Sequence, residues 1–501
     1  MRILTGSVTS NSLPRASFFP FAVAVGFILL PVIAIGGSRA LDLTIGTSCA
    51  WLVIVYSTIR LTIMGLKGEK TLISMTFWIF AYTLFGFVPL VQLTAAQDSL
   101  TNQYSPELIG ITYGVILIGL VAFDVGSTSI RLRPFSFFLS RSFSENVVSR
   151  RKSLVLALLS LVSAPVLVAV FGGLSQLFLS RSERFRALAE ASGGSDSQVR
   201  QQIVSALITT PTFVAFFALL ALYLYERRTA SSGANKLRLL LVVILGFTTF
   251  IINNPISTAR FLVGTIILSL GFYLLPWRKA YSFSITAFAI TLLFIVVFPF
   301  ADVFRNSLEV EVTGYFQETT FESQIVRKGD YDGFEQVVNS IEFVDRNGLG
   351  LGRHLLGTAL FWFPRSFWPD KPIPSGQLIA EFRGTENVNL SLPLWGEFYL
   401  DGHLAAVIIG FLLYGSLVGA IETQYAKARS DKPTFATLFV PVYSAYQFFL
   451  LRGSLLSATA YLVPIILCMR FCTTRSRESW RPEARANEQT RSSRKRAGTA
   501  A

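Results

Sequence analysis

Long apolar segments separated by shorter polar ones form the main pattern of this sequence. Twelve segments are apolar on all sides, and most have about 18–22 residues, the length that crosses roughly 30 Å of hydrocarbon as a helix. A soluble helix of this length would carry a polar face. The pattern therefore predicts an all-α, polytopic membrane protein with about twelve spans, at residues 18–36, 43–63, 72–93, 107–126, 153–174, 203–225, 237–253, 261–277, 281–300, 403–422, 434–451 and 454–471.

The polar segments between the predicted spans are short except at two places. Residues 175–202 and 301–402 form two large outer loops, and the second lies between the ninth and tenth spans. A loop of that length is usually functional. We therefore predict one membrane domain over residues 1–472, in which the two outer loops form the active site.

Residues 473–501 have a different composition. They are polar, basic and poor in apolar side chains, so we expect a disordered cytoplasmic tail. Such a tail is typical of nucleic-acid binding, or of a contact with anionic lipid beside a membrane span, and we favour the lipid. We therefore expect no nucleic-acid partner.

The distribution of charge sets the predicted orientation. Charged residues make up 15% of the chain and hydrophobic residues 52%, whereas soluble domains have about 25% charged residues. With the N-terminus inside, 29 of the 44 lysines and arginines fall on the inner side and 15 on the outer side. Because cytoplasmic loops collect basic residues, both termini are predicted to be cytoplasmic. The first span is interpreted as an anchor, because its apolar run is longer than that of a signal peptide.

Motifs for cofactors and metals are missing from the sequence. The three cysteines lie within or at the end of predicted spans, so they form neither a disulfide framework nor a zinc site. The sequence has no phosphate-binding Walker loop and no dinucleotide-binding fingerprint. We therefore predict no cofactor and no metal.

The first outer loop contains a candidate anion site. A capping box followed by a Gly-Gly stop predicts a short helix over about 181–192. Arg181 and Arg184 lie on one face of its first turn, where the helix dipole disfavours positive charge unless an anion binds. A surface helix that binds lipid headgroups is the other interpretation.

The second outer loop contains the sequence FWFPRSFWPDKP at 361–372. Its three prolines exclude a regular helix and predict a rigid turn. We interpret this turn as the wall of a polar cavity into which Arg365 and Lys371 point, because non-helical backbone at membrane depth must be buried in protein or line such a cavity. An interfacial belt whose charges reach the headgroups is the alternative. Trp362 and Trp368 suit the depth of the membrane interface.

Two further segments of the second loop are predicted to be ordered. DGFEQVVNSIEFVDR predicts a helix around 332–346, and LLGTALFWF, at 355–363, is too short to span, so we expect it to lie in the interface or to re-enter the membrane. Arg353 and His354 precede it. Arg260 follows the polar sequence NNPISTA between two other spans on the outer side. Positive charge at these places opposes the topology bias, which indicates a local use.

The segment SLPLWGEFYLDGHLAAVIIGFLLYG, at 391–415, supplies the acid/base candidates. Glu397 and Asp401 are four residues apart, so in a helix they share a face. His403 follows at the start of the tenth span, and the only other histidine of the chain is His354. An ordinary helix start, where acidic residues favour the N-terminus, is the alternative.

These two motifs together resemble the O-antigen polymerases, also called oligosaccharide repeat-unit polymerases. The matching elements are the aromatic-Pro-Arg at Pro364-Arg365, the Trp-Pro-x-Lys-Pro at 368–372 and the Gly-Glu-x-Tyr at 396–399. The specific match covers residues 361–415. The family usually continues with an Asn-Phe-Gly-like element, where this chain has Leu400-Asp401-Gly402.

The resemblance implies a glycosyltransferase of the bacterial inner membrane. The growing glycan would leave its undecaprenyl diphosphate and join the terminal sugar of the next lipid-linked repeat unit at the periplasmic face, giving O-antigen or exopolysaccharide. Fixed cations would stabilise the departing diphosphate, and a carboxylate or histidine would take the proton of the acceptor hydroxyl. The implied partners are the undecaprenyl-diphosphate-linked oligosaccharide, the lipid bilayer, a chain-length regulator protein and a flippase.

The predicted site has two sets of residues. The acid/base set, with Glu397 as first choice, comprises Glu397, His354, Asp401 and His403. The set that would bind diphosphate and sugar comprises Arg365, Lys371, Arg260, Arg184, Arg181, Arg353, Trp368 and Tyr399.

Two other functions fit parts of the pattern. An O-antigen ligase uses the same donor with a lipid A-core acceptor. Its large outer loop also carries an arginine with a histidine, a pattern to which His354 of this chain is similar. A transporter or flippase of lipid-linked oligosaccharide fits twelve spans, but transporters place polar residues at the middle of the membrane. The predicted spans are nearly free of charge, which favours chemistry at the surface.

Overall fold

The computed structural model describes most of the chain. The described residues are 13–36, 43–67, 71–95, 99, 101, 103–129, 143, 145–170, 198–227, 232–254, 258, 260–275, 280–297, 325–326, 331–385, 390–428 and 432–475. The helix predicted at 181–192, with Arg181 and Arg184, lies outside the described residues.

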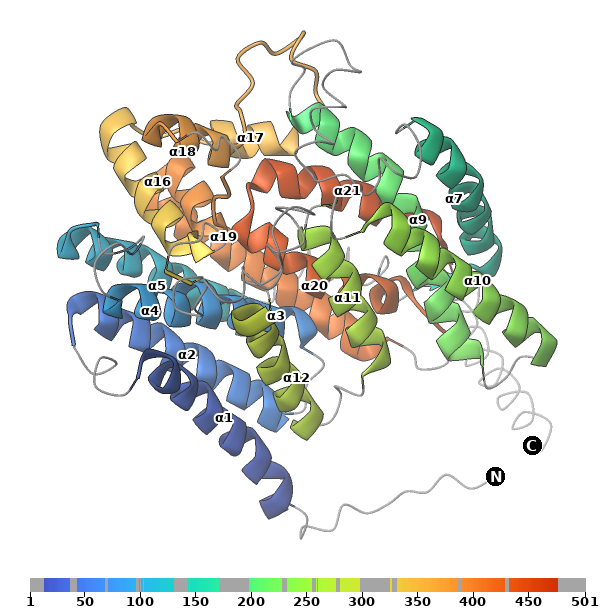
Figure 1. Cartoon of the computed structure of the whole chain (residues 1–501), viewed down its shortest axis with the longest axis horizontal. Helices are drawn as coiled ribbons and strands as arrows, with labels where there is room; N and C mark the ends of the chain where they lie inside the picture. Colours follow the sequence, from blue (N-terminus) through green and yellow to red (C-terminus); the bar gives the residue numbers. More distant parts are fainter. Residues whose placement is uncertain are drawn as a thin grey trace, which may run out of the picture.

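Helices make up nearly all of the described structure (Figure 1). Their bounds are α1 (Leu13–Ile35), α2 (Ile45–Lys67), α3 (Leu72–Ala81), the π-helix η2 (Tyr82–Phe87), α4 (Val88–Thr94), α5 (Pro106–Thr128), α7 (Arg150–Val170), α9 (Gln198–Glu226), α10 (Ser232–Ile252), α11 (Arg260–Leu274), α12 (Ala280–Leu292), the π-helix η4 (Leu293–Val297), α16 (Gly333–Asn347), α17 (Arg353–Ala359), α18 (Ser375–Arg383), α19 (Leu394–Lys427), α20 (Phe435–Arg452) and α21 (Leu455–Phe471). Two short strands, β1 (Asn146–Val148) and β2 (Thr473–Arg475), complete the elements.

The predicted spans coincide with helices. Each of the twelve apolar segments overlaps one helix, or one run of joined helices in the case of α3–η2–α4 and α12–η4. In the described part of the chain, seven helices are long and apolar enough to cross a membrane, and three shorter helices are also apolar. The structure therefore has the helices of a multi-pass membrane protein. The helix predicted around 332–346 is α16.

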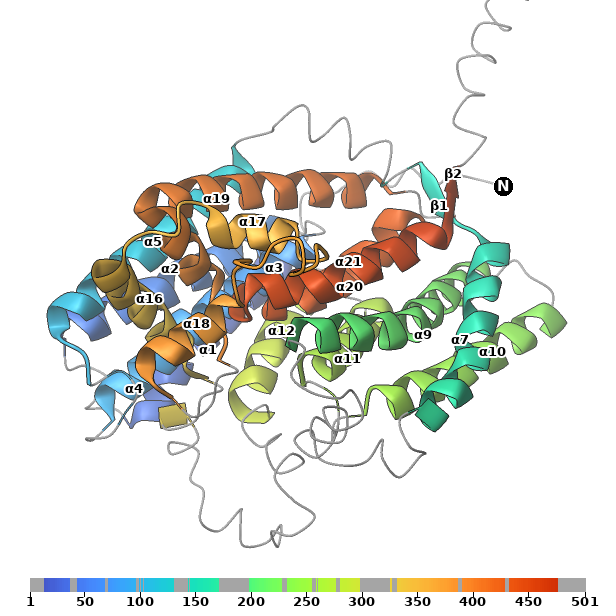
Figure 2. The same cartoon turned by 90° about the horizontal axis from the view of Figure 1, so that it is seen from above.

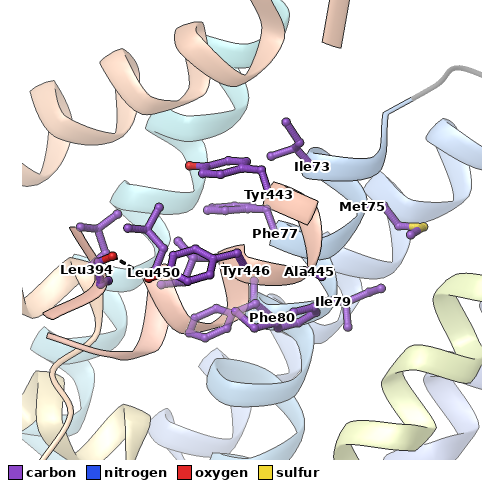
Figure 3. Packing of buried hydrophobic residues seen from close by; sticks show 14 of the residues in the cluster. Ile73, Met75, Phe77, Ile79, Phe80, Leu394, Tyr443, Ala445, Tyr446 and Leu450 are labelled. Atoms are coloured by element: carbon purple, nitrogen blue, oxygen red, sulfur yellow. Dashed lines mark hydrogen bonds between the residues drawn. The ribbon is translucent and has the colours of Figure 1, made fainter. Parts of the chain in front are cut away.

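The run α3–η2–α4 lies inside the bundle, where every residue from Leu72 to Gln92 is buried. Figure 3 shows Phe77 and Phe80 of α3 beside Tyr443 and Tyr446 of α20. Aromatic rings bury large apolar areas, so these contacts stabilise the centre of the bundle. A helix that packs against neighbours on every side needs no polar face, which explains the uniform apolar character of this segment.

The long helix α19 packs closely along α5. Glycines make this approach possible, because a Cβ at Gly126 of α5 would overlap the Leu412 carbonyl and a Cβ at Gly415 of α19 would overlap the Phe123 carbonyl. Small residues of this kind let the backbones of membrane helices touch. The contact fixes α19 in the bundle, and with it the N-terminal end of α19 that carries the site candidates.

The two ends of the bundle differ. Figure 1 shows α16, α17 and α18 gathered at one end, and Figure 2 shows β1 and β2 at the opposite end. β2 pairs antiparallel with β1, with Thr474 opposite Val147. The predicted start of a disordered tail at residue 473 is therefore wrong, because the backbone of 473–475 finds a strand partner. Residues 476–501 lie outside the described residues.

Three charged side chains inside the bundle have polar partners. Arg60 of α2 binds Asp124 of α5 at 2.5 Å, and the Tyr56 hydroxyl donates to the same carboxylate at 2.8 Å. Glu422 of α19 accepts hydrogen bonds from the backbone N–H and the hydroxyl of Ser74, both at 2.8 Å. Ionised groups among membrane helices are tolerated when they are paired in this way.

A polar cluster joins α16 to Gln103 and Tyr104, which directly precede α5. Glu335 lies beside the Gln103 amide at 3.3 Å and the Tyr104 hydroxyl at 3.5 Å, and this hydroxyl donates to Asn339 at 2.8 Å. Burial and the neighbouring Asp332 carboxylate raise the pKa of Glu335 to about 7. The cluster therefore holds a carboxyl that is protonated more easily than an ordinary glutamate.

We expect Glu335→Gln to stabilise the protein at alkaline pH. A carboxyl with a raised pKa binds more protons in the folded state, so the free energy of unfolding falls as pH rises from about 4.3 to about 7 and stays lowered above that. One pKa unit corresponds to about 1.4 kcal/mol, and solvent screening reduces this value. The free energy of unfolding of Glu335→Gln at pH 8 should therefore exceed that of the wild-type protein by about 1–2 kcal/mol.

Thermal unfolding in detergent at pH 5 and at pH 8 measures this effect. Glu381→Gln, on the exposed side of α18, is the matched control. An equal gain at the two pH values would show that Glu335 does not titrate in the expected range.

Candidate functional site

Helix α19 breaks near its start. Gly402 (φ −163°, ψ 30°) and His403 (φ 54°, ψ −152°) have non-helical backbone, which separates the short helix 394–401 from the long helix that follows. The sequence predicts that the tenth span begins at residue 403, and the break lies at that point. The short helix carries Glu397 and Asp401, whose side chains organise the candidate site.

Asp401 holds the start of α17. Its Oδ1 accepts hydrogen bonds from the His354 backbone N–H at 3.1 Å and from the imidazole Nδ1 at 2.8 Å, and its Oδ2 accepts from the Leu355 N–H at 2.7 Å. The carboxylate thus neutralises the positive end of the helix. It also keeps the proton on Nδ1, which leaves Nε2 as the basic nitrogen. A histidine oriented by an aspartate in this way is equipped to act as a general base.

The His354 ring remains accessible. Its side chain is 15% exposed, whereas that of Asp401 is 1% exposed. Among the described residues, Nε2 of His354 has no hydrogen-bond partner. A substrate hydroxyl can therefore approach the basic nitrogen while the aspartate stays buried behind it.

Gly350 belongs to the candidate site, although the sequence patterns did not point to it. A Cβ at this position would lie 2.5 Å from both Asp401 Oδ1 and His354 Nδ1, and the Gly350 N–H donates to the Leu400 carbonyl at 2.8 Å. Only glycine lets the backbone pass so close to the two side chains. The available signal is the sequence GLGLG at 348–352, which directly precedes Arg353 and His354.

Glu397 lies deeper than the sequence predicts. Glu397 is 1% exposed. Its Oε2 accepts a hydrogen bond from the Ser375 hydroxyl at 2.6 Å, and its Oε1 accepts one from the Leu455 N–H at 2.7 Å. Both oxygens are therefore occupied by the starts of α18 and α21. The predicted location of Glu397 at the open mouth of the span is wrong, because its carboxyl group joins two helices instead of facing an open space. Its acid/base role stays a prediction.

We expect Glu397→Ala to lower the free energy of unfolding by about 2–3 kcal/mol, because two buried donors lose their acceptor. Glu397→Gln keeps an acceptor for the Leu455 N–H, so we expect a smaller loss of stability and most of the turnover per folded molecule. Thermal unfolding in detergent, combined with turnover normalised to folded protein, measures both quantities. If Glu397→Gln keeps the wild-type stability but loses turnover, Glu397 is the acid/base group.

The second histidine has a different environment. His403 Nε2 lies 2.6 Å from the Tyr399 hydroxyl, and the two rings are 4.5 Å apart. The positive φ of His403 is unfavourable for a residue with a Cβ and costs about 1–3 kcal/mol. The Tyr399 contact therefore helps to hold a strained turn, and it occupies the nitrogen that a substrate would need.

Arg365 and Lys371 turn back onto the loop that carries them. Arg365 Nη1 donates to the Lys371 carbonyl at 2.7 Å and Nη2 to the Pro372 carbonyl at 3.2 Å. Lys371 Nζ donates to the carbonyls of Phe361 and Phe363, at 2.6 and 3.0 Å. The predicted non-helical backbone at 361–372 is confirmed. Its cations stiffen it by binding its own carbonyls.

These two cations form an uncompensated pair. Among the described residues, no carboxylate lies within ion-pair distance of Arg365 or Lys371. Lys371 is 6% exposed, and this burial, together with the neighbouring Arg365 charge, lowers the pKa of Lys371. A bound anion would remove this electrostatic cost, because an opposite charge favours the protonated lysine.

The cationic turn adjoins the histidine helix. The ring of Pro372 lies 3.2 Å from the position of a Cβ on Gly357 of α17. Arg353, at the start of α17, donates from Nη2 to the Asp370 carbonyl at 2.6 Å. Trp368 belongs to the same turn, where its carbonyl accepts from the Lys371 N–H at 3.1 Å. The structure therefore brings Arg353, His354, Arg365, Trp368 and Lys371 into one neighbourhood.

Other predicted residues lie elsewhere. Arg260 begins α11, which packs mainly against α20, and the adjacent Phe261 stacks on Phe449 at 3.5 Å. Its assignment to the set that would bind the diphosphate and sugar stays a prediction. In the described ranges, no three side chains of histidine, cysteine, aspartate or glutamate are grouped so that they could hold a metal ion.

Comparison with protein-family models, with curated proteins and with solved structures gives no match for this chain.

Proposed function

We propose that the protein is a membrane glycosyltransferase that polymerises undecaprenyl-diphosphate-linked oligosaccharide repeat units. The observation that carries the proposal is that the helix of a histidine oriented by an aspartate adjoins a non-helical turn with two cations that have no carboxylate partner among the described residues. A base and an anion-binding turn are the two parts that this transfer reaction needs. The resemblance of residues 361–415 to the O-antigen polymerases supplies the substrate class.

The cations would bind the diphosphate of the donor. When undecaprenyl diphosphate leaves the anomeric carbon, negative charge develops on its oxygens, and preorganised cations stabilise that charge. Arg365 uses two N–H groups on loop carbonyls, and a guanidinium has five, so three remain for phosphate oxygens. The chain's own carbonyls hold the guanidinium in place before the substrate arrives.

His354 would take the proton of the acceptor. The hydroxyl oxygen of the terminal sugar forms the new bond to the anomeric carbon, and the bond from that carbon to the diphosphate oxygen breaks. The hydroxyl proton moves to Nε2, and Asp401 stabilises the imidazolium through Nδ1. His354 therefore replaces Glu397 as our acid/base assignment, and Glu397 becomes a residue that positions α18 and α21.

The proposed topology has twelve spans, cytoplasmic termini, and the site at the periplasmic face of the bacterial inner membrane. After Cys49, Cys468 and Cys472 are replaced by serine, single cysteines at Glu381 and Lys427, both exposed, report the two sides. We expect an impermeant thiol reagent to label position 381 in intact spheroplasts and position 427 only after lysis. The reverse result would put the proposed site on the wrong side of the membrane.

A deletion strain tests the function. Loss of a polymerase leaves glycolipids capped with one repeat unit, loss of a ligase leaves no glycan on the lipid A-core, and loss of a flippase leaves lipid-linked units in the cytoplasm. The ligase remains the second candidate, because a histidine beside arginines also fits it. Purified protein with a synthetic lipid-diphosphate repeat unit completes the test, since only a polymerase makes longer chains from that unit alone.

A further inference from the structure

The turn at 361–372 carries exposed aromatic rings as well as cations. Trp362 and Phe367 are 62% and 78% exposed. The Phe363 ring lies between them, with its centroid 6.0 Å from each of theirs. We call Trp362, Phe363 and Phe367 the aromatic surface. Exposed rings are ordinary on the lipid-facing side of a span, but this segment is a non-helical turn outside the predicted spans.

The aromatic surface is tied to Arg365 and Lys371. The Phe363 carbonyl accepts a hydrogen bond from Lys371 Nζ at 3.0 Å, and Arg365 lies between Phe363 and Phe367 in the chain. The backbone on both sides of Trp362 is therefore held by the lysine that supplies one of the charges. Figure 1 shows this turn projecting beyond the helices next to α17. A ligand with an anionic group joined directly to an apolar chain would cover both features.

We propose that the aromatic surface binds the first isoprene units of the lipid-diphosphate donor, those nearest the diphosphate held by Arg365 and Lys371. This inference rests on the proposed function. Rigid rings offer apolar area to a branched, unsaturated chain at little cost in conformational entropy. The charge of the cations matches that of the diphosphate. The surface makes the site selective for polyprenyl diphosphates over short-chain diphosphates that carry the same sugar.

Kinetics with donors of different chain length test the proposal. Burying one such ring contributes on the order of a tenfold change in affinity. We therefore expect Trp362→Ser and Phe367→Ser each to raise KM about tenfold for an undecaprenyl donor, and to leave KM for a two-carbon alkyl diphosphate donor little changed. Phe367→Leu should restore most of the affinity for the long donor. Phe247→Ser, on a lipid-facing ring of α10 with similar exposure, is the matched control.

Photocrosslinking separates this inference from the proposed function. We expect a donor with a diazirine on the second isoprene unit to label residues 362–367 of the wild-type protein. If the donor labels these residues but the protein polymerises no donor, the lipid-binding inference is supported and the proposed polymerase function is contradicted. If both serine variants keep the wild-type ratio of KM for the long-chain donor to KM for the short-chain donor, the inference is contradicted. The proposed polymerase function is not affected by that result. Brominated phospholipid can also quench the fluorescence of Trp362. If excess donor does not relieve this quenching, the rings contact the bilayer and not the donor, which contradicts the inference.

Discussion

Replacing His354 by alanine should slow polymerisation by about 100- to 10,000-fold, the range that a general base contributes. In the proposed reaction the imidazole takes the proton of the acceptor hydroxyl, and its Nδ1 is held by Asp401 at 2.8 Å. Because the base acts in the chemical step, the loss should appear in kcat, and KM for the donor should change little. Turnover of purified protein with a synthetic lipid-diphosphate repeat unit measures both constants.

Asp401→Asn extends this prediction. An amide in place of the carboxylate no longer fixes the proton on Nδ1, so kcat should fall substantially although the side-chain shape is retained. If the two side chains act as one unit, the double variant should be about as slow as His354→Ala alone. Asp401 also holds two N–H groups of α17, so thermal unfolding must be measured beside turnover.

Three results would contradict the base assignment. One is a His354→Ala variant that polymerises at the native rate. Another is a loss of turnover that follows only the loss of folded protein. The third is a larger loss in kcat for His403→Asn than for His354→Ala, because His403 Nε2 is already engaged by Tyr399. Rescue of His354→Ala by added imidazole would support a proton-transfer role, which a purely structural histidine would not show.

Arg365→Ala is the second variant with a large expected effect. Removing one fixed donor from a transition-state site typically lowers kcat by about 100- to 1,000-fold, or about 2.7–4 kcal/mol. Arg365→Lys keeps the charge and loses the planar fork, so it should also be impaired, by a smaller factor. A lysine cannot bind the carbonyls of Lys371 and Pro372 and still present several N–H groups to a diphosphate.

Arg365 also stabilises the turn, so the two roles must be separated. Limited proteolysis around 361–372 reports whether the turn keeps its structure in each variant. Arg383→Lys is the control, because this arginine of α18 binds Glu342 at 3.1 Å and lies outside the cationic turn. Two results would contradict the assignment of Arg365 to the diphosphate site. One is an Arg365→Lys variant with native kcat, and the other is an Arg365→Ala variant whose only defect is cleavage of the turn.

The carboxylates of α19 have a shared structural role. Glu397 accepts from the N–H of Leu455 at the start of α21, Asp401 from those of His354 and Leu355 at the start of α17, and Glu422 from that of Ser74 at the start of α3. Each carboxylate therefore stabilises the positive end of another helix. One helix fixes the starts of three others, and the candidate base sits on one of them.

The sequence by itself determined the features that depend on neighbouring residues. Uniform apolar runs marked the helices of the bundle, the prolines of 361–372 excluded a regular helix, and the periodicity of 332–346 predicted α16. The start of the tenth span at residue 403 matches the break in α19. Backbone preference and burial of apolar faces act over a few residues, so local patterns reveal them.

Only the tertiary structure decided which polar groups meet. His354 and Asp401 are 47 residues apart, and Leu455 and Glu397 are 58 apart. A buried polar group must find a partner, but helix packing determines which groups come within reach. The spacing of Glu397 and Asp401 thus predicted a shared face correctly, but not that Glu397 binds two helix starts while Asp401 orients His354. The same holds for Arg365 and Lys371: the sequence placed them in a rigid turn, and folding directed their side chains to carbonyls of that turn.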